Sequence, residues 1–121
     1  MPKILLLIFI SLVLSGCLKG IENTAGALTG INAVEQKLQA DADIALIQAR
    51  QVYRQAVLDG VDLSSGPCLS NNLIPGWVLD IAHNPRQAID NNPANQCPAY
   101  RDGAANHFIE MDVYGTVIKS K

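Results

Sequence analysis

The segment His83-Asn84-Pro85-Arg86 carries the residue types best suited to binding chemistry. An imidazole titrates near neutral pH and acts as a base or a metal ligand, and a guanidinium binds anions. Asp80 lies three residues before His83, and Trp77, the single tryptophan, offers an aromatic surface for stacking. Trp77, Asp80, His83 and Arg86 therefore form the candidate ligand site. The alternative is structural: Asn-Pro forms a turn, His83 bonds locally, Arg86 is solvated and Trp77 anchors the core.

Other polar side chains do not form a catalytic or metal-binding pattern. A metal site of His83, His107, Glu110 and Asp112 fails, because His107 and Glu110 point to opposite faces of a regular strand. The run Asp90-Asn91-Asn92 lacks the glycine and the glutamate of a calcium loop. No Gly-x-Ser-x-Gly, His-Glu-x-x-His or phosphate-loop pattern is present. The sequence predicts neither a metal site nor an enzyme.

The N-terminal region is a short apolar run with a positive start. Residues Ile4 to Leu14 include only Ser11 as a polar residue, and Lys3 precedes them. A bilayer-spanning helix needs roughly 20 apolar residues, so this shorter run is typical of a secretory signal. The run ends in Leu14-Ser15-Gly16-Cys17, which resembles the lipobox of bacterial lipoproteins.

The lipobox implies a processed and lipid-anchored protein. In that family the cysteine thiol is diacylated, the signal is cleaved before the cysteine, and the new amino terminus is often acylated. The resemblance implies a signal peptide over residues 1–16, with Cys17 as the lipidation site and the covalent lipid as the sole attached group. Two or three acyl chains anchor a protein stably, since each buried methylene contributes about 0.8 kcal/mol. The alternatives are an ordinary signal peptide with an incidental cysteine, or an uncleaved anchor.

The residue after the lipobox cysteine bears on whether a lipoprotein stays at the inner membrane or reaches the outer membrane. In Gram-negative lipoproteins, Asp at this position often favours retention at the inner membrane. This chain has Leu18 there. The resemblance therefore implies an extracytoplasmic place in the cell envelope, at the outer membrane if the organism is Gram-negative.

Two cysteines remain once Cys17 is assigned to lipid. An even pair in a small exported domain indicates a disulfide, here between Cys68 and Cys97. The alternative, a metal or catalytic pair, lacks the close Cys-x-x-Cys spacing typical of zinc sites.

A long amphipathic helix follows a segment rich in small residues. Residues 17–30 contain several glycines and predict a flexible tether ahead of one small domain over residues 31–121. Apolar residues then recur at steps of three and four, a spacing that predicts a helix over residues 31–58. They are Ile31, Val34, Leu38, Ala42, Ala45, Ala49, Val52 and Ala56. The alanine-rich part of this face allows close approach either of the protein's own domain or of a second helix.

Short strands are predicted beyond Gly60, which is expected to stop the helix. The strands cover residues 77–82, 107–112 and 116–119, and the last two form a hairpin with Gly115 in its turn. His107, Ile109 and Met111 are expected on its core face. The predicted fold is α+β: one long N-terminal helix packed on a small antiparallel sheet of about three strands. The disulfide is expected to clamp the loop-rich segment around the first strand.

The lipobox resemblance implies a place at the cell envelope, and the remaining cysteine pair and the lack of a catalytic pattern favour an interaction role there. The net charge is −2 and the arginines are dispersed, which argues against nucleic-acid binding. We expect a structural or protein-interaction module, bound to the membrane through its lipid, with a protein partner or self-association. One alternative is a small-ligand or metal-binding lipoprotein that uses Trp77, His83 and Arg86. The other is a self-assembling surface protein that associates through the alanine-rich helix.

The predicted outline is similar to that of type IV pilins, which join a long N-terminal helix to a small disulfide-bearing sheet domain. Pilins keep their apolar segment after the processing site and usually have Glu at the fifth mature position. Here the apolar run precedes the site, and the fifth residue counted from Cys17 is Ile21. This departure argues against assembly by the pilin route.

Overall fold

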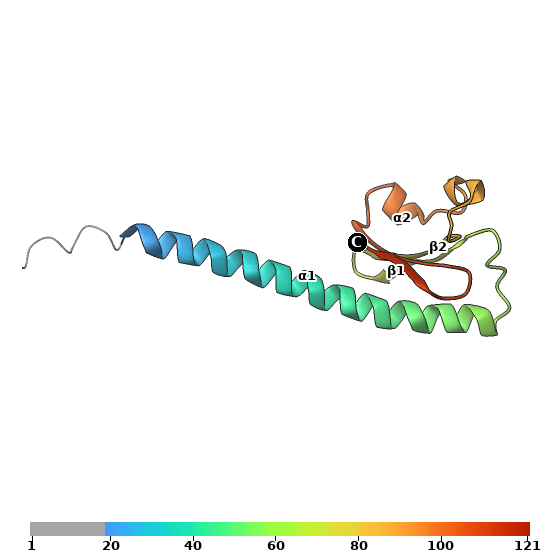
Figure 1. Cartoon of the computed structure of the whole chain (residues 1–121), viewed down its shortest axis with the longest axis horizontal. Helices are drawn as coiled ribbons and strands as arrows, with labels where there is room; N and C mark the ends of the chain where they lie inside the picture. Colours follow the sequence, from blue (N-terminus) through green and yellow to red (C-terminus); the bar gives the residue numbers. More distant parts are fainter. Residues whose placement is uncertain (1–18) are drawn as a thin grey trace, which may run out of the picture. The chain divides into compact units, whose positions relative to one another are not determined.

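The computed structural model describes the backbone of residues 19–121 and the side chains of residues 29–121. The predicted signal peptide and the lipidation site Cys17 lie outside the described residues. The elements follow in the order α1 (Lys19–Leu58), β1 (Cys68–Ile74), β2 (Trp77–Ile81), the 3₁₀ helix η1 (Ala88–Asn91), α2 (Pro98–Arg101), β3 (His107–Met111) and β4 (Val117–Ser120) (Figure 1). The chain divides into two compact units, with the boundary after Leu38.

Helix α1 begins at Lys19, earlier than the predicted start at residue 31. The segment predicted as a flexible tether is therefore helical from Lys19 onward. Glycine in a helix costs about 1 kcal/mol relative to alanine, but no proline interrupts this stretch and most other residues tolerate a helix. The predicted end is confirmed: α1 stops at Leu58, and Gly60 follows with a positive φ of 72°. No helix in the described part of the chain is long and apolar enough to cross a membrane.

The four strands form a mixed sheet in the order β1-β2-β3-β4. The α+β class is confirmed, but the sheet has one strand more than predicted and is not wholly antiparallel. Strands β1 and β2 are antiparallel, as are β3 and β4, whereas β2 and β3 are parallel. Parallel neighbours need a long crossover connection, and the segment from Ala82 to Asn106 provides it.

Strand β1 was not predicted, because Ser70, Asn71 and Asn72 are residues that favour turns. The sequence signal for it is the turn that follows. Pro75-Gly76 joins β1 to β2 in a tight hairpin, and Gly76 adopts a positive φ of 80°. Proline followed by glycine at the centre of a turn is the signature of type II.

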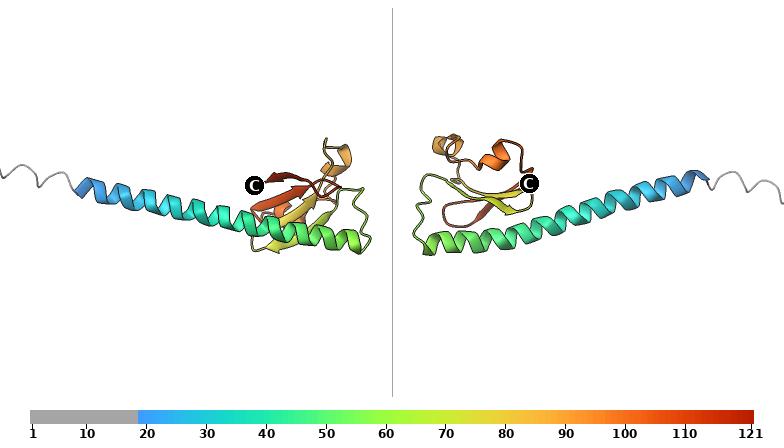
Figure 2. Two further views of the ribbon diagram at one scale, coloured as in Figure 1. Left: turned by 60° about the horizontal axis from the view of Figure 1, so that its bottom comes forward. Right: turned by 180° about the vertical axis from the view of Figure 1, so that it is seen from behind.

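The second half of α1 packs on one face of the sheet. Figure 2 shows this half of the helix lying along the sheet. Ala45 and Ala49 are fully buried in a cluster with Leu79, Ile109 and Met111. Small alanine side chains let the helix backbone approach the strands closely. This part of the alanine-rich face therefore packs against the protein's own domain, which was one of the two interpretations of the sequence.

Strand alternation separates the two faces of the sheet. On β3, Ile109 and Met111 face α1, as predicted, whereas Phe108 and Glu110 face the opposite side. On β4, a register irregularity beside Met111 lets Val117 join the helix-facing core while Lys119 faces the opposite side. Figure 1 shows η1 and α2 on that second side.

Candidate functional site

A cavity of about 330 Å³ lies on the sheet face opposite α1. Strands β2, β3 and β4 contribute to its lining, together with residues of the crossover and of α2. Its lining residues are Val78, Asp80, Arg86, Gln96, Cys97, Tyr100, Arg101, Phe108, Glu110, Lys119 and Lys121. This volume is at the lower end of the range for small-molecule pockets.

Strand register aligns the charged residues of the cavity in one row. Asp80 on β2 pairs with Glu110 on β3, and Glu110 pairs with Lys119 on β4. A second row is largely apolar, with Val78 beside Phe108. The backbone of Phe108 exchanges hydrogen bonds of 2.8 and 3.0 Å with that of Lys121, which places Lys121 at the end of this row.

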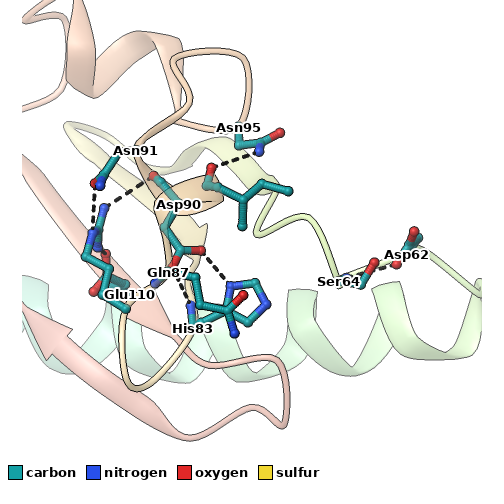
Figure 3. Close-up of polar contacts among 10 residues, drawn as sticks. Asp62, Ser64, His83, Gln87, Asp90, Asn91, Asn95 and Glu110 are labelled. Carbon is teal, nitrogen blue, oxygen red and sulfur yellow. Dashed lines mark hydrogen bonds and ion pairs between the residues drawn. The ribbon is translucent and has the colours of Figure 1, made fainter.

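Arg86 holds the crossover segment against the sheet. Its Nη1 donates to Glu110 Oε2 at 3.0 Å, its Nε to Asn91 Oδ1 at 3.1 Å, and its Nη2 to the carbonyl of Asp90 at 3.3 Å (Figure 3). The side chain of Glu110 is only 14% exposed, so its charge needs this partner. The guanidinium is thus occupied within the protein.

Asp80 is the least satisfied polar residue on the cavity wall. Its Oδ1 is buried and has no hydrogen-bond partner in the described part of the chain. Burial raises the pKa of Asp80 to about 7; the neighbouring Glu110 charge adds to the rise, and Arg86 opposes it. Buried polar groups are normally paired, which makes this carboxylate the strongest candidate for contact with a ligand.

His83 belongs to a local network instead of the cavity. Its backbone N–H and that of Gln87 donate to Asp90 Oδ2 at 3.1 and 2.7 Å, and His83 Nδ1 lies 2.8 Å from Asp90 Oδ1 (Figure 3). Asp90 is 3% exposed. Burial raises the pKa of Asp90, but the hydrogen bonds from Gln87 and His83 outweigh burial and hold that pKa below its usual range. This network fixes the loop that follows β2.

Trp77 lies on the other side of the sheet, in the core with the α1-facing residues. Its ring stacks on that of His107, with centroids 4.7 Å apart. Of the four predicted site residues, the structure therefore brings Asp80 and Arg86 to the cavity. Trp77 and His83 take the structural roles that the sequence left open.

Two aromatic and two lysine residues of the cavity were not among the predicted site residues: Tyr100, Phe108, Lys119 and Lys121. The alternation of β3 was the available signal, since it places Phe108 and Glu110 together on the face away from the core. No local sequence signal shows that this face of β3 lies beside Asp80. The two are brought together by the parallel pairing of β2 with β3.

The predicted disulfide between Cys68 and Cys97 is present, with Cα atoms 4.9 Å apart. Cys68 begins β1, and Cys97 is the N-cap residue of α2. The bond ties the crossover to the sheet and fixes one wall of the cavity. In the described residues, no group of three or more His, Cys, Asp or Glu side chains is placed to hold a metal.

The raised pKa of Asp80 predicts an unusual pH dependence of stability. Its folded pKa of about 7 exceeds the unfolded value of 3.8, so the stability that this group contributes is complete below about pH 4 and is lost as pH rises through about 7. We expect Asp80→Asn to gain stability relative to the wild type between pH 5 and pH 8. Urea unfolding at the two pH values measures this.

The exposed Asp59 offers a matched control, since Asp59→Asn makes the same chemical change outside the cavity. Asp59→Asn should follow the wild type at both pH values. An equal pH response of the wild type and Asp80→Asn would contradict the burial argument.

The Asp90 network predicts a second stability effect. Asp90→Asn removes a charge that accepts several hydrogen bonds in a buried position, so we expect a loss of about 1–3 kcal/mol in the free energy of unfolding at pH 7. Asp62→Asn is the control, because Asp62 accepts a bond from the Ser64 N–H at 2.9 Å but is exposed (Figure 3). That variant should stay within about 0.5 kcal/mol of the wild type. Equal losses in both variants would argue against a special role for Asp90.

No protein-family model, no curated protein and no solved structure matches this chain. Its function must therefore be inferred from the chemistry of its own residues.

Proposed function

We propose that the protein is a lipid-anchored, extracytoplasmic component of the cell envelope that acts as a structural or interaction module. The lipobox at Leu14 to Cys17 supports the anchor. The disulfide between Cys68 and Cys97 supports the compartment, since such bonds are rare in reducing cytoplasm. If the organism is Gram-negative, Leu18 favours the outer membrane.

The exposed apolar residues of α1 are the observation that carries the interaction role. Ile31 and Val34 are each 62% exposed and Leu38 is 45% exposed. Their spacing places them on one face of the helix. Contiguous exposed apolar side chains are typical of a surface that contacts another protein. We propose that this face, the Ile31–Leu38 stripe, contacts an apolar helix of a second copy or of a partner protein.

The stripe also refines the idea of self-assembly through the alanine-rich part of α1. Ala45 and Ala49 are fully buried in the domain core, so they are not open to a second copy. Association between copies would use the Ile31–Leu38 stripe instead.

The anchor is tested by expression of the wild type and of Cys17→Ser in a bacterial host. The wild type should enter the membrane fraction, and its intact mass should show loss of residues 1–16 and gain of acyl chains. Cys17→Ser lacks the thiol that would be acylated, so its intact mass should show no acyl chains. A mature wild type with an unmodified Cys17 contradicts the anchor.

The contact surface is tested by Val34→Glu, which places a charge within the stripe. Gln36→Glu is the matched control, because it adds the same charge at an exposed position two residues away, on the opposite side of the helix from the stripe. In-membrane crosslinking and sedimentation equilibrium should show association in the wild type and in Gln36→Glu, and loss of association in Val34→Glu. A monomer under every condition, without any crosslinked partner, contradicts the proposal.

A second candidate function is binding of a small ligand in the cavity. The unpartnered Oδ1 of Asp80 on the cavity wall is the observation that favours it. This candidate keeps Asp80 and Arg86 of the predicted site and replaces Trp77 and His83 with residues of β3 and β4. A thermal-unfolding screen with a panel of small amines, acids and amino acids tests it. A ligand that raises the melting temperature of the wild type but not of Asp80→Asn supports it.

A further inference from the structure

The cavity presents charges of both signs in a defined order. Asp80 and Glu110 lie on neighbouring strands, and Lys119 follows on the next strand. Neighbouring strands are about 4.8 Å apart, so the backbones of Asp80 and Lys119 are separated by about 10 Å. A ligand in the cavity therefore meets the Asp80 carboxyl group at one end and lysine ammonium groups at the other, with Glu110 and its partner Arg86 on the wall between them.

The carboxylate end has an unfilled acceptor. Glu110 is already paired with Arg86 at 3.0 Å, whereas Asp80 Oδ1 is buried without a partner in the described chain. A simple anion would be repelled by ionised Asp80, because Arg86 already balances the charge of Glu110. A positively charged donor would satisfy Asp80 Oδ1 and would interact favourably with Glu110 as well.

The opposite end carries the ammonium groups of Lys119 and Lys121. The ammonium of Lys119 lies 5.8 Å from the centre of the Phe108 ring. Within residues 29–121, neither Lys119 nor Lys121 forms an ion pair with a carboxylate side chain. A simple amine would gain nothing from these groups, whereas a ligand carboxylate would pair with them.

Beside this charged row, the neighbouring row of the cavity wall is largely apolar. Phe108 and Tyr100 pack edge to face with centroids 5.0 Å apart, and Val78 lies beside Phe108 on the neighbouring strand. An aliphatic or aromatic side chain would contact this wall. The small cavity volume favours a ligand of few heavy atoms.

We propose that the cavity binds a free α-amino acid with an apolar side chain, its ammonium on Asp80, its carboxylate on Lys119 and Lys121, and its side chain against Phe108 and Tyr100. This assignment rests on the second candidate function, that the cavity takes a small ligand. It names the chemical class of that ligand.

The pH dependence of binding follows from the groups that face Asp80. These are Glu110 on β3 and Arg86 and Asp90 on the crossover. Together with burial they raise the pKa of Asp80 to about 7, whereas a bound ammonium favours the ionised carboxylate. Affinity should therefore rise between pH 6 and pH 8, and this rise should be absent in Asp80→Asn.

The test is calorimetric titration of the purified protein with L-leucine and, separately, L-phenylalanine. Two analogues of leucine isolate its charged groups: 4-methylpentanoate lacks the ammonium, and 3-methylbutylamine lacks the carboxylate. We expect saturable binding of at least one amino acid, and binding weaker by about tenfold or more for both analogues of leucine. Asp80→Asn should weaken binding by about tenfold, and Lys119→Gln by severalfold.

Controls separate these effects from folding. Asp59→Asn and Lys37→Gln make the same chemical changes outside the cavity and should bind as the wild type does. The analogue comparison needs no variant, so it decides the question even where a substitution perturbs the fold. The proposal is overturned if neither amino acid binds at millimolar concentration, if an analogue binds equally well, or if Asp80→Asn leaves affinity unchanged.

The outcomes also separate this proposal from the one on which it rests. If another member of the thermal-unfolding panel binds at Asp80 but leucine and phenylalanine do not, the amino-acid assignment fails and the ligand-binding function stands. If no panel member changes the melting temperature, both fail.

Discussion

Gly115→Ala should lower the free energy of unfolding by about 3 kcal/mol, the sum of a backbone cost and a packing cost. Gly115 has a φ of 85° in the turn between β3 and β4, a conformation that costs an alanine about 1–2 kcal/mol. An added Cβ would also lie 2.5 Å from Cε1 of Tyr53 on α1. Such overpacking adds about 1–3 kcal/mol, because the aromatic ring or the turn must move.

The two costs can be separated with Gly76→Ala. Gly76 has a similar φ of 80°, but an added Cβ there meets nothing within 4 Å. Gly76→Ala should therefore show the backbone cost alone. Chemical denaturation of both variants gives the packing cost as the difference between their losses in the free energy of unfolding. Equal losses would show that the Tyr53 ring moves aside at no energetic cost.

A further variant locates the packing cost on Tyr53. The Tyr53 hydroxyl donates to the carbonyl of Val113 at 3.1 Å, so the ring and the hairpin turn are held together. Replacing Tyr53 with Leu should destabilise the wild type, but it should recover part of the loss caused by Gly115→Ala. A strictly additive double variant would argue against this contact.

Reduction of the disulfide should lower the free energy of unfolding by about 3.5 kcal/mol. Cys68 and Cys97 are 29 residues apart in sequence, and opening a loop of this size returns conformational entropy to the unfolded chain. That loss is a large share of the 5–15 kcal/mol typical of a domain. Thermal unfolding with and without reductant measures it.

The double variant Cys68→Ala/Cys97→Ala is the control for reduction. It should be destabilised by a similar amount, and reductant should not change its melting temperature further. Because Cys97 lines the cavity, reduction should also lower the affinity of the cavity for any ligand. A melting temperature of the wild type that is indifferent to reductant would contradict the role of this bond.

Much of the fold was predictable because its signals are local. The three- and four-residue spacing of apolar residues after Ile31 indicates a helix without knowledge of its neighbours, and Gly60 marks its end. Alternation in β3 identified Ile109 and Met111 as core residues, and Gly115 identified the hairpin turn. The sequence contains three cysteines, and the pairing of Cys68 with Cys97 followed once the lipobox resemblance set Cys17 aside.

The errors arose where local propensity was overruled. Three glycines near residue 25 suggested a tether, although the chain there is helical from Lys19. Polar residues hid β1, whose place in the sheet is set by its hairpin with β2. At β4, a register irregularity turned Val117 and Lys119 to opposite faces, which no regular alternation predicts.

The sequence by itself determined the α+β class, the end of the main helix, the disulfide partners and the core-facing residues Ile109 and Met111 of β3, because each depends on near neighbours or on counting. The tertiary structure decided which polar residues meet. The parallel pairing of β2 with β3 aligns Asp80 with Glu110, and the next pairing adds Lys119. Register between distant strands arises from packing of the whole sheet against α1 and the crossover. Tertiary packing therefore places Asp80 and Arg86 at the cavity, whereas Trp77 and His83 stabilise the fold.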